Sequence, residues 1–409
     1  MTKLSDELNS EVIPTQMPSQ RLPRPVRAYH LIALVLLIAF FAQCAWFVAS
    51  VPLTQLEADQ ILRGVALLRH LPLATEPVSS PLVPLLSVAG ILFHLPQNPV
   101  LLDQFWLDQH RWFIRAPFLL AGLCMALSLW YVARRLYGTA AGHIALALFA
   151  FSPGMVARSS LAGPEIFAAW GAFGLIFTAI ATAHTLYAPR EVILWNWKRI
   201  VLLGVSITFA IGAQWPLAWL LVPAAVFMLW AVPYRRAAAL LILSAASTVA
   251  LVLLDLCYIA DPRALLNGLR SATWISLSFQ DLSPLHPVFL LRLLGHFYFN
   301  SIPAGLLLFT IVLGAWTASR RIRFFGNTAP LIVFLLLLGI AVVLPINGAG
   351  VILFAGLPFL LLFISGVFAD LIESELQSPA LAVIFAVIAA QSAYSIASLI
   401  RMYSRLPGS

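Results

Sequence analysis

Residues 115–138 read RAPFLLAGLCMALSLWYVARRLYG, an apolar stretch that ends in two arginines and a glycine. A bilayer core about 30 Å thick requires roughly 20 apolar residues in a helix. The stretch therefore predicts a membrane span, which we place near residues 113–133. Its basic end is expected to face the cytoplasm, because cytoplasmic loops are enriched in Lys and Arg.

The composition of the whole chain agrees with this prediction. Of its 409 residues, 61% are hydrophobic and only 10% are charged, with a mean hydropathy of +0.95, whereas soluble domains contain about 25% charged residues. The formal charge of +8 comes mainly from small basic clusters between apolar segments. Such clusters indicate membrane topology rather than a nucleic-acid groove, so we expect an all-α polytopic membrane protein and no nucleic-acid partner.

The same criterion applied along the chain predicts about eleven transmembrane helices. They are placed near residues 29–51, 113–133, 139–153, 164–186, 199–213, 214–232, 237–259, 286–317, 328–345, 349–371 and 378–400. The shorter run at 79–95 contains two prolines and is expected to form an interfacial or re-entrant helix. We expect residues 1–28 to be a disordered cytoplasmic tail and residues 29–409 to form a single transmembrane domain.

With the N-terminus in the cytoplasm, every basic cluster faces inward and the segment SVPLTQLEADQILRGVALLRH, residues 50–70, lies outside. Its apolar residues recur at helical spacing, which predicts an amphipathic helix with its apolar side in the lipid boundary. These residues are Ile61, Leu62, Val65 and Leu68. Glu57 and Asp59 would lie at the helix N-terminus, where the dipole favours acids, so both have a structural explanation beside a catalytic one.

A second outer segment, SPGMVARSSLAGPEIF at residues 152–167, forms a tight hairpin between two predicted spans. Glu165 follows a proline at a predicted helix start, where an acid is favoured by the dipole. Arg158 is close enough in sequence to form an ion pair with it.

A polar stripe is predicted inside the membrane, in HPVFLLRLLGHFYFN at residues 286–300. Arg292, His296 and Asn300 are four residues apart and share one helix face. Ionisable residues at membrane depth are costly and usually face a cavity, a partner or a substrate path. The alternative is a contact in which they bond to carbonyls of neighbouring helices.

Taken in order, these features resemble the C-type (GT-C) membrane glycosyltransferases, especially the branch of protein O-mannosyltransferases and aminoarabinose transferases. That family has a first outer loop with an acidic pair, an amphipathic helix and a Pro-Pro-Leu-like segment, then a helix opening with Arg and a hairpin ending in Pro-Asp. The matching stretches are LEADQILRGVALLRH, SSPLVPLLSVAGILF, RAPFLLAGLCMALSLWYVARRLYG and ALFAFSPGMVARSSLAGPEIFAAW, with FAIGAQWPLAWLLVP and VILFAGLPFLLLFISG further on.

The resemblance implies a GT-C fold in a bacterial inner membrane, with the active loops on the outer face. It implies transfer of a sugar from a polyprenyl-phosphate-linked donor to an acceptor glycan, lipid or protein. Glu57 would be the general base and Asp59 the second candidate, with a divalent metal as a possible cofactor. The remaining candidates would bind substrate, the lipid phosphate above all; they are Arg158, Glu165, Arg292, His296 and Asn300.

The chain lacks the aromatic or basic residue that the family has before its late Pro segment, and it departs from the family pattern at two further positions. Leu56 stands where the family has the first acid of its pair, and Gln214 stands where it tends to have Lys. Two further hypotheses therefore remain. One is a catalytically inactive GT-C-like subunit that scaffolds an envelope-polysaccharide assembly. The other is a lipid-linked saccharide transporter, in which the intramembrane polar stripe would line the substrate path.

Overall fold

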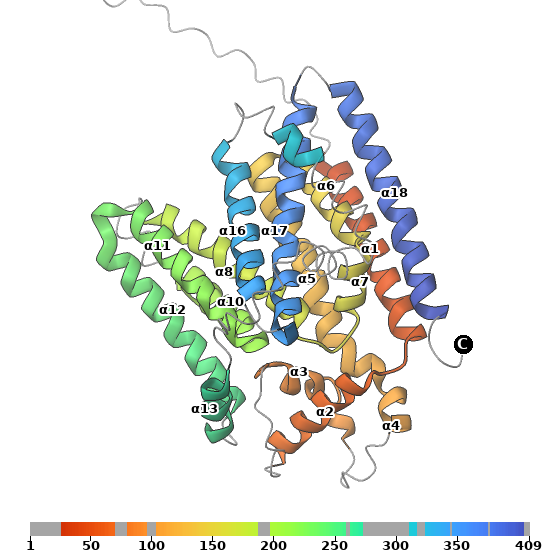
Figure 1. Ribbon diagram of the computed structural model, residues 1–409, viewed down its shortest axis with the longest axis vertical. Helices are drawn as coiled ribbons and strands as arrows, with labels where there is room; N and C mark the ends of the chain where they lie inside the picture. The colour runs from red at the N-terminus through yellow and green to blue at the C-terminus, as the bar shows by residue number, and fades with distance from the viewer. Residues whose placement is uncertain are drawn as a thin grey trace, which may run out of the picture.

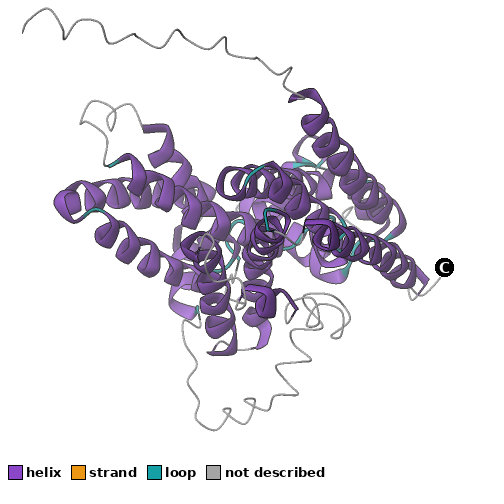
Figure 2. Ribbon diagram, turned by 90° about the horizontal axis from the view of Figure 1, so that it is seen from above, coloured by secondary structure: helices purple, strands orange, loops and turns teal. Residues whose placement is uncertain are grey.

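The computed structural model describes most of the chain, with gaps. The described residues are 26–69, 80–95, 104–186, 197–258, 262–272, 311–316, 324–343, 346–374 and 377–404. Throughout them the regular elements are helical (Figure 2). Six helices are long and apolar enough to cross a membrane, or seven if one bent pair counts as a span. The predicted all-α polytopic membrane fold is confirmed.

The six long candidates form the framework of the bundle (Figure 1). They are α1 (Val26–Ser50), α5 (Arg111–Tyr137), α8 (Glu165–Thr185), α12 (Arg236–Cys257), α17 (Ile346–Ile372) and α18 (Gln377–Ser404). Three further expected spans are helical but shorter: α10 (Trp197–Ala213), η3 (Trp215–Leu220) with α11 (Leu221–Ala231), and α16 (Phe324–Val343). The span expected at 286–317 lies almost wholly outside the described residues, so the count of about eleven stays a prediction.

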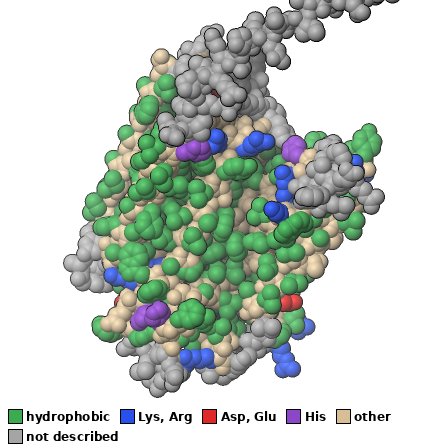
Figure 3. Space-filling model, turned by 180° about the vertical axis from the view of Figure 1, so that it is seen from behind, with side chains coloured by type: hydrophobic (Ala, Val, Ile, Leu, Met, Phe, Trp, Pro, Cys, Tyr) green, Lys and Arg blue, Asp and Glu red, His purple; other side chains and the backbone are tan. Residues whose placement is uncertain are grey.

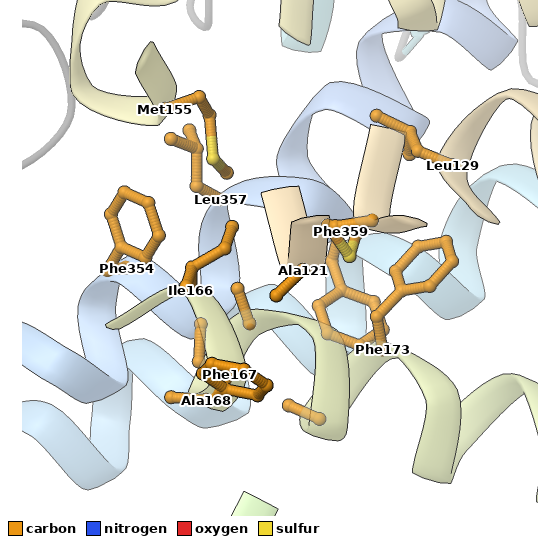
Figure 4. Close-up of a cluster of buried hydrophobic side chains, with 14 of the residues drawn as sticks. Ala121, Leu129, Met155, Ile166, Phe167, Ala168, Phe173, Phe354, Leu357 and Phe359 are labelled. Atoms are coloured by element: carbon orange, nitrogen blue, oxygen red, sulfur yellow. The ribbon is translucent and has the colours of Figure 1, made fainter. Parts of the chain in front are cut away.

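Helix α17 lies at the centre of the bundle. The spanning window of α17 is 100% buried, whereas those of α1, α12 and α18 are 28% buried. A helix that is hydrophobic all round is expected in such an interior position. Its Phe354, Leu357 and Phe359 pack among side chains of α5, α7 and α8 (Figure 4). The face of the bundle seen in Figure 3 is largely hydrophobic.

Four short helices gather at one end of the bundle (Figure 1): α2 (Gln55–Leu68), α3 (Val83–Ala89), α4 (Gln104–Gln109) and α13 (Pro262–Ser271). The apolar side of α2 packs against α3, and its Ile61 and Val65 are 0% and 2% exposed. The expected lipid contact of these two residues is therefore wrong, because α3 already covers them. Leu62 and Leu68 on the same helix remain exposed.

The span expected at 139–153 is broken instead of straight. Helices α6 (Thr139–Ala150) and α7 (Pro153–Ser159) meet at an angle of 68°. The break falls directly before Pro153, which cannot donate a backbone hydrogen bond and is favoured in the first turn of a helix. Helix α7 thereby turns back toward α8 and carries the outer hairpin.

Candidate active site at the outer end

Glu57 is the central side chain of the candidate site, and its neighbour Thr54 fixes its position. Thr54 is the N-cap of α2, and its Oγ1 accepts a hydrogen bond from the Glu57 backbone N–H at 3.3 Å. In return the Glu57 Oε2 accepts from the Thr54 backbone N–H at 2.9 Å and from its hydroxyl at 3.1 Å. This capping box satisfies two helix-end donors and holds the carboxylate against the start of α2.

Arg115 on α5 supplies the charge that faces this carboxylate. Its Nε donates to Glu57 Oε1 at 2.9 Å and its Nη2 donates to Oε2 at 2.8 Å, so the pair is bidentate. The same guanidinium donates to the carbonyls of Val51 at 2.7 Å and Pro52 at 2.9 Å. Arg115 thus ties α5 to the end of α1 and to the start of α2.

The hairpin after α7 provides the remaining donor. The backbone N–H of Ala162 donates to Glu57 Oε1 at 2.8 Å. A carboxylate offers about four lone-pair sites, and Glu57 accepts from five donors. With its side chain 4% exposed and that of Arg115 0% exposed, the carboxylate is saturated and shielded from solvent.

The protonation of Glu57 follows from these contacts. Burial by itself raises the pKa of the carboxyl group, but the hydrogen bond and charge of Arg115 outweigh it, together with the backbone donors of Ala162 and Thr54. The net result is a pKa held below its ordinary value of 4.5. The carboxyl group is therefore ionised near neutral pH, and the carboxylate is a weak proton acceptor.

A second Arg–Glu pair lies in the same hairpin. Arg158 in the last turn of α7 donates through Nη1 to Glu165 Oε1 at 2.6 Å, and Glu165 is the first residue of α8. The ion pair expected from the sequence is therefore present. The two side chains are 38% and 13% exposed, so the Arg158 guanidinium is accessible to a solute or to a lipid headgroup.

Amide side chains hold the hairpin at the break between α6 and α7. A broken helix leaves carbonyls without intrahelical partners, which is costly in a membrane. Gln43 on α1 donates to the Ala150 carbonyl at 3.0 Å, and Gln391 on α18 donates to the Phe151 carbonyl at 3.2 Å. These two bonds fix the position of α7, and with it that of Arg158.

Asp59 and Leu56 lie on the other side of the first turns of α2, where both are exposed. Leu56, at the position of the family's first acid, is 77% exposed. Gln214 directly precedes η3 and makes no side-chain capping bond to it. It lies two residues after Gly212, whose carbonyl accepts from the Leu82 backbone N–H at 2.9 Å. Gln214 therefore lies near the start of α3, within the same outer end.

The structure thus brings several predicted site residues to one end of the bundle. Glu57, Arg158 and Glu165 are linked through the hairpin, while Asp59 faces outward beside them. Arg292, His296 and Asn300 lie outside the described residues. Arg115 is the residue that sequence reasoning did not assign. An arginine at the start of an apolar span was the available signal, because such a charge requires a partner.

A divalent metal finds no evident ligand set in this part of the molecule. Within the described ranges, no group of three or more His, Cys, Asp or Glu side chains could hold a metal ion. The Glu57 oxygens are already occupied by five donors. The described residues therefore do not fit a metal site, and no step below depends on one.

Two comparisons with known proteins confirm the predicted resemblance to the GT-C membrane glycosyltransferases. The family model for dolichyl-phosphate-mannose-protein mannosyltransferase matches residues 106–258, a range that includes Arg115, Arg158 and Glu165.

Two solved structures of an oligosaccharyltransferase from Archaeoglobus fulgidus are similar to this chain. The apo form gives a TM-score of 0.62 at 12% identity, over 91% of this chain and 56% of that one. The complex of AglB with an inhibitory peptide and a dolichol-phosphate gives a TM-score of 0.55 at 12% identity, with the same coverage. The chain thus spans little more than half the length of these structures. No curated protein matches it in sequence.

Proposed function

We propose that the protein is a glycosyltransferase that moves a sugar from a polyprenyl-phosphate lipid to an acceptor hydroxyl at the outer face of a bacterial inner membrane. The observation that carries this proposal is the saturated Glu57 carboxylate. It joins the first outer loop, α5 and the hairpin within a GT-C fold. Asp59 on α2 and Arg158 in the hairpin thereby lie at the same end of the bundle.

Asp59 is the better candidate for the general base. Glu57 is buried, fully hydrogen-bonded and has a lowered pKa, so it has no free lone pair for an incoming proton. Asp59 is exposed two residues further along the same helix. In this proposal Glu57 is a positioning residue, which acts by fixing the turn of α2 that carries Asp59.

The reaction requires one proton transfer and one displacement. Asp59 accepts the proton of the acceptor hydroxyl as the oxygen attacks the anomeric carbon of the donor sugar. The bond from that carbon to the phosphate oxygen breaks, and the lipid phosphate leaves with the bonding electrons. Arg158 stabilises the charge that develops on the phosphate. Arg292, His296 and Asn300 remain predicted ligands of that phosphate.

One observation favours the second candidate, a non-catalytic subunit of an envelope-polysaccharide assembly. At the position of the family's first acid the chain presents Leu56, which is 77% exposed. An exposed apolar side chain cannot accept a proton, but it could contact another protein. In this alternative the Glu57–Arg115 pair would keep its structural role without any chemistry at Asp59.

Transfer of labelled sugar from polyprenyl-phosphate donors into membrane products tests the proposal. Membranes would contain equal amounts of folded wild type, Asp59→Asn or Arg158→Ala. The matched controls are Asp255→Asn and Arg270→Ala, which change exposed residues of α12 and α13. Loss of general-base catalysis typically lowers the rate by about 10²–10⁴-fold, so we expect such a loss for Asp59→Asn and unchanged rates for both controls.

Full transfer by Asp59→Asn would overturn the assignment of the base. If the wild type itself makes no glycosylated product, while deletion of the protein still stops envelope assembly, the non-catalytic subunit replaces the transferase.

A further inference from the structure

Four aromatic or imidazole rings form a continuous row at the outer end of α5. Phe113 stacks on His94 with ring centroids 5.0 Å apart, and His94 lies 5.7 Å from His110. His110 in turn stacks on Trp106 at 3.9 Å and bonds through Nδ1 to the Trp106 carbonyl at 2.8 Å. The row joins η1 (Leu92–His94), α4 and the first turn of α5.

Large apolar side chains in and beside this row are exposed on the surface of the protein. We call them the aromatic outer patch: Leu92, Phe93, Phe105, Trp112 and Phe113. Phe93 is 94% exposed and Phe105 is 71% exposed, and the other three are between 42% and 49% exposed. A Phe side chain that is fully exposed to water forgoes the favourable free energy of its burial. Five such side chains together indicate contact with an apolar phase.

The patch is continuous with the lipid-facing side of α5. Phe113, Leu120 and Leu127 follow one another at intervals of seven residues, and Leu120 and Leu127 are 61% and 44% exposed. Residues seven apart lie on nearly the same face of a helix. The exposed face of this span therefore runs up to Phe113 and into the row of rings.

We propose that the aromatic outer patch is inserted into the outer leaflet, at the boundary between headgroups and acyl chains. Aromatic side chains concentrate at this depth in membrane proteins. His94, His110 and Arg111 lie beside the patch, where polar and basic groups meet lipid headgroups. The lipid contact expected for Ile61 and Val65 of α2 is thus made instead by the residues of the aromatic outer patch.

Two contacts connect this anchor to the outer helices. Asp108 on α4 accepts from the Leu53 backbone N–H at 2.8 Å, directly before α2. Gly90 at the end of α3 lies so close to the Phe113 carbonyl that a Cβ would collide with it. The depth of the patch therefore sets the height of α2 and α3 above the membrane, whether or not the protein is a transferase.

Photo-crosslinking in nanodiscs tests this proposal on the full chain. Benzoylphenylalanine would replace Phe93 or Phe105, whose exposed positions leave room for the added benzoyl group. Lipid adducts would be counted by mass spectrometry in phosphatidylcholine discs. Leu120 is the control for a lipid-facing position, and Asp59 is the control for a hydrated one. Size-exclusion chromatography confirms that each labelled protein is folded.

Interfacial insertion buries an apolar face about 5–10 Å into the boundary. We therefore expect lipid adducts at positions 93 and 105 to match those at Leu120 and to exceed those at Asp59 about tenfold. Adduct yields at the level of Asp59 would overturn the proposal, and so would crosslinks mainly to a second copy of the protein.

Discussion

The two Arg–Glu pairs of the candidate site differ in their burial and in the number of hydrogen bonds that they make. In the Glu57–Arg115 pair the side chains are at most 4% exposed, and the carboxylate accepts five hydrogen bonds from three parts of the chain. In the Arg158–Glu165 pair they are 38% and 13% exposed, and one hydrogen bond joins them within a single hairpin. The first pair is buried and fully hydrogen-bonded, and the second is partly exposed to its surroundings.

The energetic consequence of this difference is large. Removing one partner of a buried ion pair leaves an uncompensated charge and typically costs about 3–5 kcal/mol. An exposed pair typically contributes about 0–1 kcal/mol, because water screens it. A residue can therefore be essential in two ways, and only a stability measurement made beside an activity measurement separates them.

The largest effect is expected from Arg115→Ala. The substitution leaves the Glu57 carboxylate buried without its counter-charge, so we expect the free energy of unfolding to fall by about 3–5 kcal/mol. Unfolding in mixed detergent and dodecyl sulfate micelles measures it. Arg158→Ala is the control, and an equal loss in both variants would remove the distinction between the pairs.

The next effect is expected where α2 crosses α3. A Cβ at Gly64 would lie well inside van der Waals distance of the Pro84 carbonyl oxygen, and overpacking of this kind typically costs about 1–3 kcal/mol. Gly64→Ala should therefore destabilise the outer end. Gly339→Ala is the matched control, because a Cβ there meets nothing within 4 Å. Equal stability of the two variants would contradict the observed packing of α2 on α3.

An effect of similar size, but confined to the hairpin, is expected at its support. Gln43→Leu removes the donor to the Ala150 carbonyl, and an unsatisfied buried acceptor costs about 1–3 kcal/mol. The hairpin should become more accessible to hydrogen exchange, while Gln109→Leu, at an exposed position of α4, should change little. Unaltered exchange at residues 152–163 in Gln43→Leu would show that the amide bond is not needed.

The smallest effect near neutral pH is expected from titration of Glu57. Its pKa is lowered in the folded state, so the unfolded chain binds the proton first as the pH falls. The stabilisation is therefore complete above the ordinary value of 4.5 and is lost as the pH drops through the folded pKa. Unfolding measured across this range should decline only on the acid side, and Glu57→Gln should weaken that decline. A decline beginning near neutral pH would contradict a lowered pKa.

The fold was largely predictable because membrane spans are long apolar segments. Residues 113–133 and 349–371 were placed by length and hydropathy alone, and both are helices of the bundle. The break at Pro153 was harder, since the apolar run continues through it. The surroundings of α2 were not predictable either. The spacing of Ile61 and Val65 is the same whether the apolar side meets lipid or another helix.

The site was predictable in its residue types but not in its contacts. Arg158 and Glu165 are seven residues apart, so their pairing could be expected from the sequence. Glu57 and Arg115 are 58 residues apart, and their pairing depends on how α3, which packs against both α2 and α5, positions α2 beside the start of α5. The hydrogen bond from the Ala162 backbone N–H to Glu57 could not be predicted, because every residue except proline carries this donor.

Double-mutant cycles on the two pairs test the central claim most directly. Unfolding free energies would be measured for Glu57→Ala, Arg115→Ala and their combination, and likewise for Arg158→Ala, Glu165→Ala and theirs. We predict a coupling energy of about 3 kcal/mol or more for the first pair and of about 1 kcal/mol or less for the second. Equal coupling energies, or a larger one for Arg158 and Glu165, would contradict the account.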